Sequence, residues 1–174
     1  TFANRFNRMY NVSFFPEPFA FNFGEQLIKI PGLDGSTKMG KSEGENNALF
    51  LADEPDVIRK KIMRAVTDSG PKEPNQLKPQ AIENIFTLMK VLSTEATYQH
   101  FNELYNTCQI RYGDMKKQLA EDAIVFLQPL REKIKEIHAD NAYLRRVVKI
   151  GAEKARESAS KTIKEVRQIL GYKE

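Results

Sequence analysis

The chain has 174 residues, of which 41% are hydrophobic and 29% charged, and its formal net charge is +4. These fractions are typical of a soluble globular protein, and no apolar run approaches the ~18–20 residues that span a bilayer, which excludes a membrane-spanning chain of this kind. The single cysteine, Cys108, excludes an intrachain disulfide and favours a reducing compartment. We therefore expect a cytoplasmic protein with one domain or two small ones.

Residues 1–10 predict a short helix, because Phe2, Phe6 and Met9 recur on one face. After Pro16 and Pro18, three phenylalanines alternate with other residues at positions 19, 21 and 23. This period of two predicts extended chain with one buried face, and we interpret the aromatic stripe as core rather than as a ligand site. Leu27–Ile30 predicts a short strand that ends at Pro31.

Residues 33–47 form a segment rich in glycine, serine and lysine, with two lysines, Lys38 and Lys41, three positions apart. Glycine allows the backbone to approach a ligand closely, and lysine is a point charge suited to phosphate oxygens. The segment therefore predicts a mobile loop that closes over a polyphosphate. An ordinary solvated loop has the same composition, so the residues alone leave both interpretations open.

Ala48–Leu51 predicts another short strand, and Asp53 is expected to cap a helix whose first turn contains Pro55. The apolar face of that helix is expected to comprise Val57, Ile58, Ile62 and Ala65. Its cations are expected on a solvated face, with contact to RNA or phosphate as the alternative; they are Arg59, Lys60, Lys61 and Arg64.

The remaining periodicity predicts helices only. Gln80–Leu92 and Ala96–Tyr105 are expected to pair as a hairpin, followed by Asp114–Ile137 with a kink at Pro129, and by Ala152–Leu170. We expect no metal site, because neither His100 nor His138 has other ligands nearby at a suitable spacing.

The excess positive charge lies in the last segment. Residues 141–174 carry nine Lys or Arg and four acids, a net charge of +5, whereas residues 1–140 carry 18 basic and 19 acidic side chains, a net charge of −1. A basic segment suits a polyanion such as RNA. A solvated basic helix face explains the same charge, so both interpretations stay open.

The order of residues in the lysine loop also resembles a known sequence signature. Lys38-Met-Gly-Lys-Ser42 resembles the KMSKS signature of class I aminoacyl-tRNA synthetases, with Gly40 in place of a serine. Three further stretches, Ala48–Gly70, Tyr112–Lys117 and Gly151–Arg156, resemble tryptophanyl-tRNA synthetases and follow in that family's order. Tyrosyl enzymes also have glycine in this loop and are the alternative among enzymes, although the stretches at 67–70 and 151–156 do not match them.

The resemblance implies an ATP-dependent tryptophan–tRNA ligase, with Mg²⁺-bound ATP and tryptophan as substrates and no protein-bound metal. Lys38 and Lys41 would be the catalytic cations on the triphosphate, and Ser42 would add a hydroxyl contact. Gly40 would contribute backbone but lack the serine hydroxyl. Met39 would lie near the adenine, and the backbone around Ile30 and Gly32 would line the base pocket.

The resemblance also implies a mainly α-helical fold with a short β remnant. Residues 1–70 would be the C-terminal part of a Rossmann-like nucleotide-binding domain, and residues 71–174 a helical domain for the tRNA(Trp) anticodon. Candidate tRNA contacts are Arg145, Arg146, Lys149, Lys154 and Arg156. We expect the N-terminal half of the enzyme and its amino-acid pocket to be missing, so that this chain alone is inactive, and we expect the full-length enzyme to be a homodimer.

Two hypotheses outside enzymology stay open. A non-enzymatic helical RNA-binding module would use the lysine loop on the phosphate backbone, but it would not require Pro31 and Gly32 before a paired-lysine loop. A helical scaffold without a ligand would leave the charge asymmetry unexplained.

Overall fold

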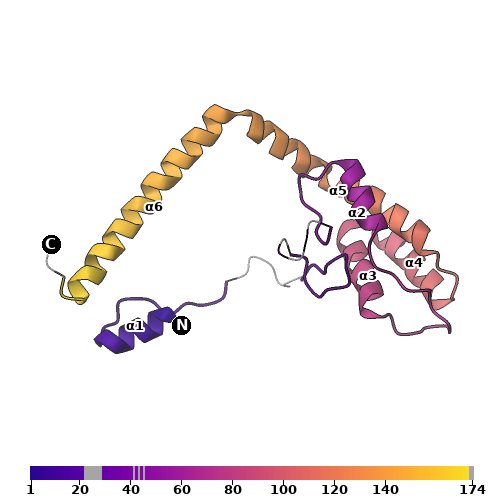
Figure 1. Cartoon of the computed structure of the whole chain (residues 1–174), viewed down its shortest axis with the longest axis horizontal. Coiled ribbons are helices and arrows are strands. Elements are labelled where there is room, and N and C mark those ends of the chain that lie inside the picture. The colour runs from indigo at the N-terminus through magenta and orange to yellow at the C-terminus, as the bar shows by residue number, and fades with distance from the viewer. Residues whose placement is uncertain (22–28, 41, 43, 45, 173–174) are drawn as a thin grey trace. The chain divides into compact units, whose positions relative to one another are not determined.

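The structure is a computed structural model that describes residues 1–21, 29–40, 42, 44 and 46–172. The described residues form six helices and no strand (Figure 1). The helices are α1 (Phe2–Tyr10), α2 (Pro55–Met63), α3 (Gln80–Leu92), α4 (Glu95–Asn106), α5 (Tyr112–Ala139) and α6 (Asn141–Ile169). The chain divides into two compact units, one comprising Thr1–Leu27 with Asp140–Glu174 and the other Ile28–Ala139. The predicted boundary at residue 70 concerns function and stays a prediction.

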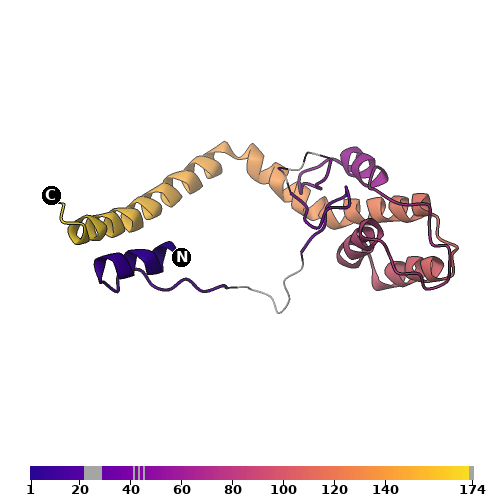
Figure 2. The ribbon, with the colours of Figure 1, turned by 60° about the horizontal axis from the view of Figure 1, so that its bottom comes forward.

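The unit Ile28–Ala139 is built around α5. Helices α2 and α3 both contact α5, and α4 contacts α3; Figure 2 shows α2 on one side of α5 and the α3–α4 hairpin on the other. Burial of apolar side chains is the main force that holds these helices together. The largest fully buried side chains are Tyr105, Phe86, Ile58, Ile62, Ile82, Ile85, Met89, Met115 and Leu119.

The predicted mainly α fold is confirmed, but the strand predicted at Ala48–Leu51 is wrong. This stretch is irregular because side chains bind its backbone: Lys61 Nζ donates to the Ala48 carbonyl at 2.9 Å, and the Asp53 carboxylate accepts from the Phe50 N–H at 2.9 Å. The buried aromatic face is wrong for Phe19 and Phe21, which are both exposed. Phe23 and Leu27–Ile28 lie outside the described residues.

Helix α2 begins at Pro55, as predicted, but Glu54 rather than Asp53 is its N-cap, and no side chain caps it. The Asp53 carboxylate is engaged by Phe50 and by Lys61 instead. Lys61 is buried and was therefore wrongly assigned to the solvated face, whereas Val57 on the expected apolar face is 40% exposed.

Helices α3 and α4 confirm the predicted hairpin, with Ser93 as the C-cap of α3 and Thr94 as the N-cap of α4. Helix α5 passes through Pro129, and the kink there stays a prediction. Helix α6 begins at Asn141, well before the expected Ala152, because Asp140 caps it by accepting from the Tyr143 N–H at 2.8 Å.

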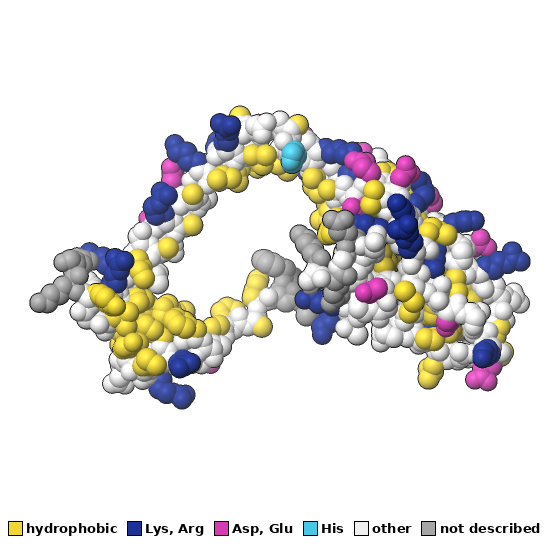
Figure 3. All heavy atoms as spheres, viewed as in Figure 1, with side chains coloured by type: hydrophobic (Ala, Val, Ile, Leu, Met, Phe, Trp, Pro, Cys, Tyr) yellow, Lys and Arg dark blue, Asp and Glu magenta, His cyan; other side chains and the backbone are white. Residues whose placement is uncertain are grey.

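The other unit contains α1 and α6. An aromatic cluster of Phe2, Phe6, Tyr10, Phe14 and Phe15 closes over α1, with ring centroids 4.7–6.3 Å apart. Helix α6 has no buried residue. Figure 3 shows Lys and Arg side chains along one edge of it and apolar side chains along the other. None of the helices in the described ranges combines the length and the apolarity of a membrane span.

Candidate functional site

Backbone hydrogen bonds join the two ends of the lysine loop, and we call the hydrogen-bonded residues 30–39 and 47 the loop base. The Gly32 N–H donates to the Ser36 carbonyl at 3.1 Å, and the Met39 N–H donates to the Ile30 carbonyl at 2.8 Å. The Leu33 N–H donates to the Asn47 carbonyl at 3.1 Å, which joins the two ends of the loop. These bonds fix the backbone at Met39, directly beside Lys38.

Two buried amide side chains complete this base. Asn47 is 3% exposed, and its Oδ1 accepts from the Asp34 N–H at 3.1 Å. Asn84 of α3 is 2% exposed and donates through Nδ2 to the Gly32 carbonyl at 3.2 Å and to the Ser36 carbonyl at 2.7 Å. These side chains give backbone groups of the loop additional hydrogen-bond partners, and Asn84 attaches the loop to the helical core.

Only glycine fits at position 32, because the surrounding atoms leave no space for a side chain. A Cβ at this position would collide with Asn47 Oδ1 and Ser36 Oγ, and it would approach Asp34 Oδ1 to 2.7 Å. Gly35 is required by backbone conformation, because its φ of +91° lies in a region that side chains disfavour. Gly32 and Gly35 therefore allow the hydrogen-bonded backbone of the loop base to form.

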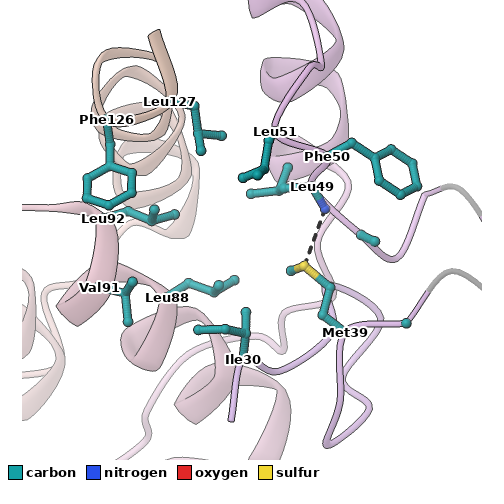
Figure 4. Close-up of a pocket in the computed structure, with 12 residues that line it drawn as sticks. Ile30, Met39, Leu49, Phe50, Leu51, Leu88, Val91, Leu92, Phe126 and Leu127 are labelled. Carbon is teal, nitrogen blue, oxygen red and sulfur yellow. Dashed lines mark hydrogen bonds between the residues drawn. The ribbon is translucent and has the colours of Figure 1, made fainter. Parts of the chain in front are cut away.

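An apolar pocket of about 370 Å³ opens beside the loop (Figure 4). Ile30, Met39 and Gly40 form one wall, and aliphatic and aromatic side chains of α3, α5 and residues 48–51 form the others. The volume is in the range of small-molecule sites. Because the lining side chains are apolar, the pocket suits a planar or aliphatic group, and none of the described residues that line it carries a cation for a phosphate.

Two polar members of the motif, Lys38 and Ser42, are accessible to solvent, whereas Lys41 lies outside the described residues. Hydrogen bonds from Ser36 lower the pKa of the exposed Asp34 carboxyl, so this acid stays ionised near the loop base. Thus the structure brings Ile30, Met39 and Gly40 to one pocket and leaves Gly32 buried beneath the loop.

The basic residues predicted to contact tRNA lie on α6, in the other unit. Arg145, Arg146, Lys149, Lys154 and Arg156 are all exposed. No ion pair to them is recorded among the residues that the structure describes, while the Arg146 guanidinium lies 5.7 Å from the centre of the Tyr143 ring. Across the described ranges, no group of three or more His, Cys, Asp or Glu side chains is placed to hold a metal ion.

A family model described as tRNA synthetases class I (W and Y) matches residues 1–128, including the lysine loop and its base. The chain belongs to this family. The match extends over α1 to the greater part of α5, so the family covers both the loop and the helical core that holds it.

Relatives narrow the similarity to the tryptophan branch. The chain is 56% identical over 172 residues to a tryptophan–tRNA ligase of Porphyromonas gingivalis, a match that covers 99% of this chain and 52% of the relative. It is 37% identical over 171 residues to the ligase of Helicobacter pylori strain 26695, covering 97% of this chain and 50% of the relative. The chain is a homologue of tryptophan–tRNA ligases and spans about half of their length.

A solved structure from the tryptophan branch has a similar fold. The tryptophanyl-tRNA synthetase of Campylobacter jejuni, complexed with ADP and tryptophan, superimposes with a TM-score of 0.70 at 26% identity, covering 97% of this chain and 51% of that chain. The mainly α architecture described above is therefore that of one part of a synthetase.

Sequence reasoning missed the residues that hold the loop. Asn47, Asn84 and Lys61 were not singled out for this role, because each is a polar residue in a pattern that otherwise predicts exposed positions. A buried amide or lysine leaves no periodic signal. The one hint for Lys61 was its position between Ile58 and Ile62 on α2, close to the buried face.

Proposed function

We propose that the full-length protein activates tryptophan with ATP and transfers it to tRNA(Trp). The observation that carries this proposal is the loop: hydrogen bonds hold its backbone at Met39, Met39 and Gly40 lie against an apolar pocket, and Lys38 is exposed. The bound ADP and tryptophan of the Campylobacter jejuni homologue support nucleotide chemistry in the same family.

In the proposed reaction, a carboxylate oxygen of tryptophan attacks the α-phosphorus of ATP. The bond from that phosphorus to the bridging oxygen breaks, and pyrophosphate leaves with its Mg²⁺. Negative charge grows on the leaving group, and cations already positioned there lower the barrier. Lys38 and Lys41 would supply these charges, with a hydroxyl contact from Ser42.

The adenine base would lie on the Ile30–Met39–Gly40 wall of the apolar pocket, with Gly32 supporting it from below. This assignment agrees with the division of the loop into an apolar side and a cationic side. A base is flat and largely apolar on its faces, whereas the triphosphate requires cations such as the exposed Lys38.

The remaining assignments follow the same proposal. Residues 1–70 would complete a Rossmann-like nucleotide-binding domain, with any short strands forming in that context, and residues 71–174 would form the helical tRNA-binding domain. The exposed cations of α6 would contact tRNA phosphates, and the full-length enzyme would act as a cytoplasmic homodimer.

Amino-acid-dependent exchange of pyrophosphate into ATP tests the proposal. The full-length gene product is expected to catalyse exchange with tryptophan and to charge tRNA(Trp). Exchange with tyrosine in place of tryptophan would move the protein to the other branch of its family. Absence of exchange with either amino acid, together with binding of RNA, would favour a non-enzymatic RNA-binding module.

A further inference from the structure

Lys61 of α2 is a buried cation whose partners all lie just after the lysine loop. Its Nζ donates to Asp53 Oδ2 at 2.7 Å and to the Ala48 carbonyl at 2.9 Å. The same ammonium lies 4.4 Å from the centre of the Phe50 ring. The Lys61 and Asp53 side chains are only 7% and 13% exposed, so solvent screens this pair little.

The partners of Lys61 fix the backbone from residue 48 to residue 53. Asp53 Oδ2 also accepts from the Phe50 N–H at 2.9 Å, and the Asp53 N–H donates to the Phe50 carbonyl at 3.0 Å. The Asp53 carbonyl in turn accepts from the Arg131 guanidinium of α5 at 3.3 Å. The Lys61 ammonium thus joins the exit of the loop to α2, and the Asp53 carbonyl joins it to α5.

This fixed segment touches the motif directly. The Leu49 N–H, between Ala48 and Phe50, points at the sulfur of Met39 at 3.4 Å, as the dashed line in Figure 4 shows. Met39 lies next to Lys38 in the chain. A displacement of residues 48–50 would therefore reach the backbone that carries the catalytic cation.

We propose that Lys61, through its ion pair with Asp53, is a positioning residue that sets the geometry of Met39 and the neighbouring Lys38 for ATP. This inference rests on the proposed function. A lysine elsewhere in a buried pair could serve stability alone; here the contacts lead to the loop, so the effect should appear in the use of ATP. Misplacement of about 1 Å can cost up to about 10²-fold in rate.

The test uses tryptophan-dependent pyrophosphate exchange by the full-length gene product, at a temperature where circular dichroism shows each variant to be folded. Lys61→Met should lower kcat/KM for ATP about 10- to 100-fold and leave the KM for tryptophan within about twofold. The matched control is Arg59→Met on the same helix, which loses exposed ion pairs to Glu121 and Asp56 and should leave both constants unchanged.

A second variant separates position from stability. Lys61→Met with Asp53→Leu replaces the ion pair by apolar side chains, an exchange that often preserves stability, but it leaves the Phe50 N–H and the Ala48 carbonyl without these partners. We expect its melting temperature to rise above that of Lys61→Met, in which the Asp53 carboxylate is left without the ammonium, while kcat/KM for ATP stays low. Recovery of both would overturn the proposal.

Two further results are distinguishable. If wild type catalyses exchange and Lys61→Met retains full kcat/KM for ATP, the inference is wrong and the proposed function stands. If wild type catalyses no exchange with tryptophan or tyrosine, the proposed function fails, and the inference fails with it.

Discussion

Single residues decide whether the loop base can form. Asn84 accepts from the Gln80 amide at 2.8 Å through Oδ1, while its Nδ2 holds two loop carbonyls, so its orientation is fixed on both sides. Asn47, at the far end of the loop, accepts from the Asp34 N–H through Oδ1 and donates to Ser36 Oγ at 3.4 Å through Nδ2. Buried amides of this kind are costly when left unsatisfied, which couples the order of the loop to the order of α3.

Gly32→Ala should destabilise the chain by about 1–3 kcal/mol, because its Cβ would overlap the polar atoms around it. The measurement is the free energy of unfolding in urea. The control is Gly113→Ala in α5, where nothing lies within 4 Å of the added Cβ and alanine favours helix by up to about 1 kcal/mol. Equal stability of wild type and Gly32→Ala would contradict the described loop base.

Lys116 gives a prediction about pH. Its Nζ donates to the Ala65 carbonyl at 2.7 Å and to Thr67 Oγ1 at 3.1 Å, and burial lowers its pKa. Between this lowered native pKa and the unfolded value of about 10.4, the unfolded chain binds more protons, so this group makes stability rise with pH.

Urea unfolding from pH 7 to 9.5 should therefore show a more positive slope of stability against pH for wild type than for Lys116→Met. The difference cannot exceed about 1.4 kcal/mol per pH unit for one proton. Tyr112 acts in the opposite direction above about pH 10, because burial and the hydrogen bond to Asp68 raise its pKa, and the range avoids it. Identical slopes would show that Lys116 is not desolvated.

At the scale of elements, the α3–α4 hairpin depends on its two-residue turn. Thr94 Oγ1 accepts from the Thr97 N–H at 3.2 Å and so caps α4, whereas the neighbouring Ser93 Oγ is buried without a hydrogen-bond partner among the described residues. The Thr94 hydroxyl thus stabilises the hairpin, whereas burial of the neighbouring Ser93 hydroxyl opposes folding.

Thr94→Ala should lower the free energy of unfolding by about 1 kcal/mol, the usual value of such a cap. Ser93→Ala should be neutral or slightly stabilising, because it removes an unsatisfied buried hydroxyl. Thermal and urea unfolding of the two variants provide the comparison. A larger loss from Ser93→Ala than from Thr94→Ala would refute this description of the turn.

Helices were predictable from the sequence where the hydrophobic periodicity and the residues at the helix ends indicate the same bounds. Gln80–Leu92 was predicted with its observed bounds, and Pro55 marked the start of α2. The irregular structure of Ala48–Leu51 was not predictable, because its backbone polar groups are bound by Asp53 and Lys61, 3 and 13 positions from the groups they bind, and no local pattern reports the burial of these side chains. The first part of α6 was missed because its basic residues obscured the apolar spacing.

The candidate site, like the helices, was predictable from the sequence only in part. The Lys38–Ser42 motif was recognisable from five consecutive residues, and the structure places Ile30, Met39 and Gly40 along one wall of a pocket. The supporting residues depend on tertiary contacts: Asn84 is 48 positions from Ser36, and no local rule pairs them. The roles of the motif residues in catalysis stay predictions.

At the scale of the whole molecule, α6 concentrates positive charge on an exposed helix. If Arg145, Arg146 and Lys149 contact tRNA phosphates, changing all three to Gln should weaken tRNA(Trp) binding by the full-length protein. The slope of log K against log salt should also fall by about 0.7–0.9 per lost contact. Filter binding between 50 and 300 mM salt, roughly the range over which such contacts are screened, would measure both.

The control for that experiment is a triple change of Lys72, Lys90 and Lys117, which are exposed cations of the other unit. It should leave the salt slope closer to that of wild type. An unchanged slope in the α6 variant would mean that these residues form only a solvated helix face.

If the lysine loop serves ATP in tryptophan activation, the full-length protein with Lys38→Ala and Lys41→Ala should lose pyrophosphate exchange. We expect a fall of about 10²-fold or more, because preorganised charges are removed from a leaving group. A charge-matched variant with Lys72→Ala and Lys117→Ala should retain wild-type exchange. Full exchange in the loop variant would show that the two lysines have no part in the chemistry.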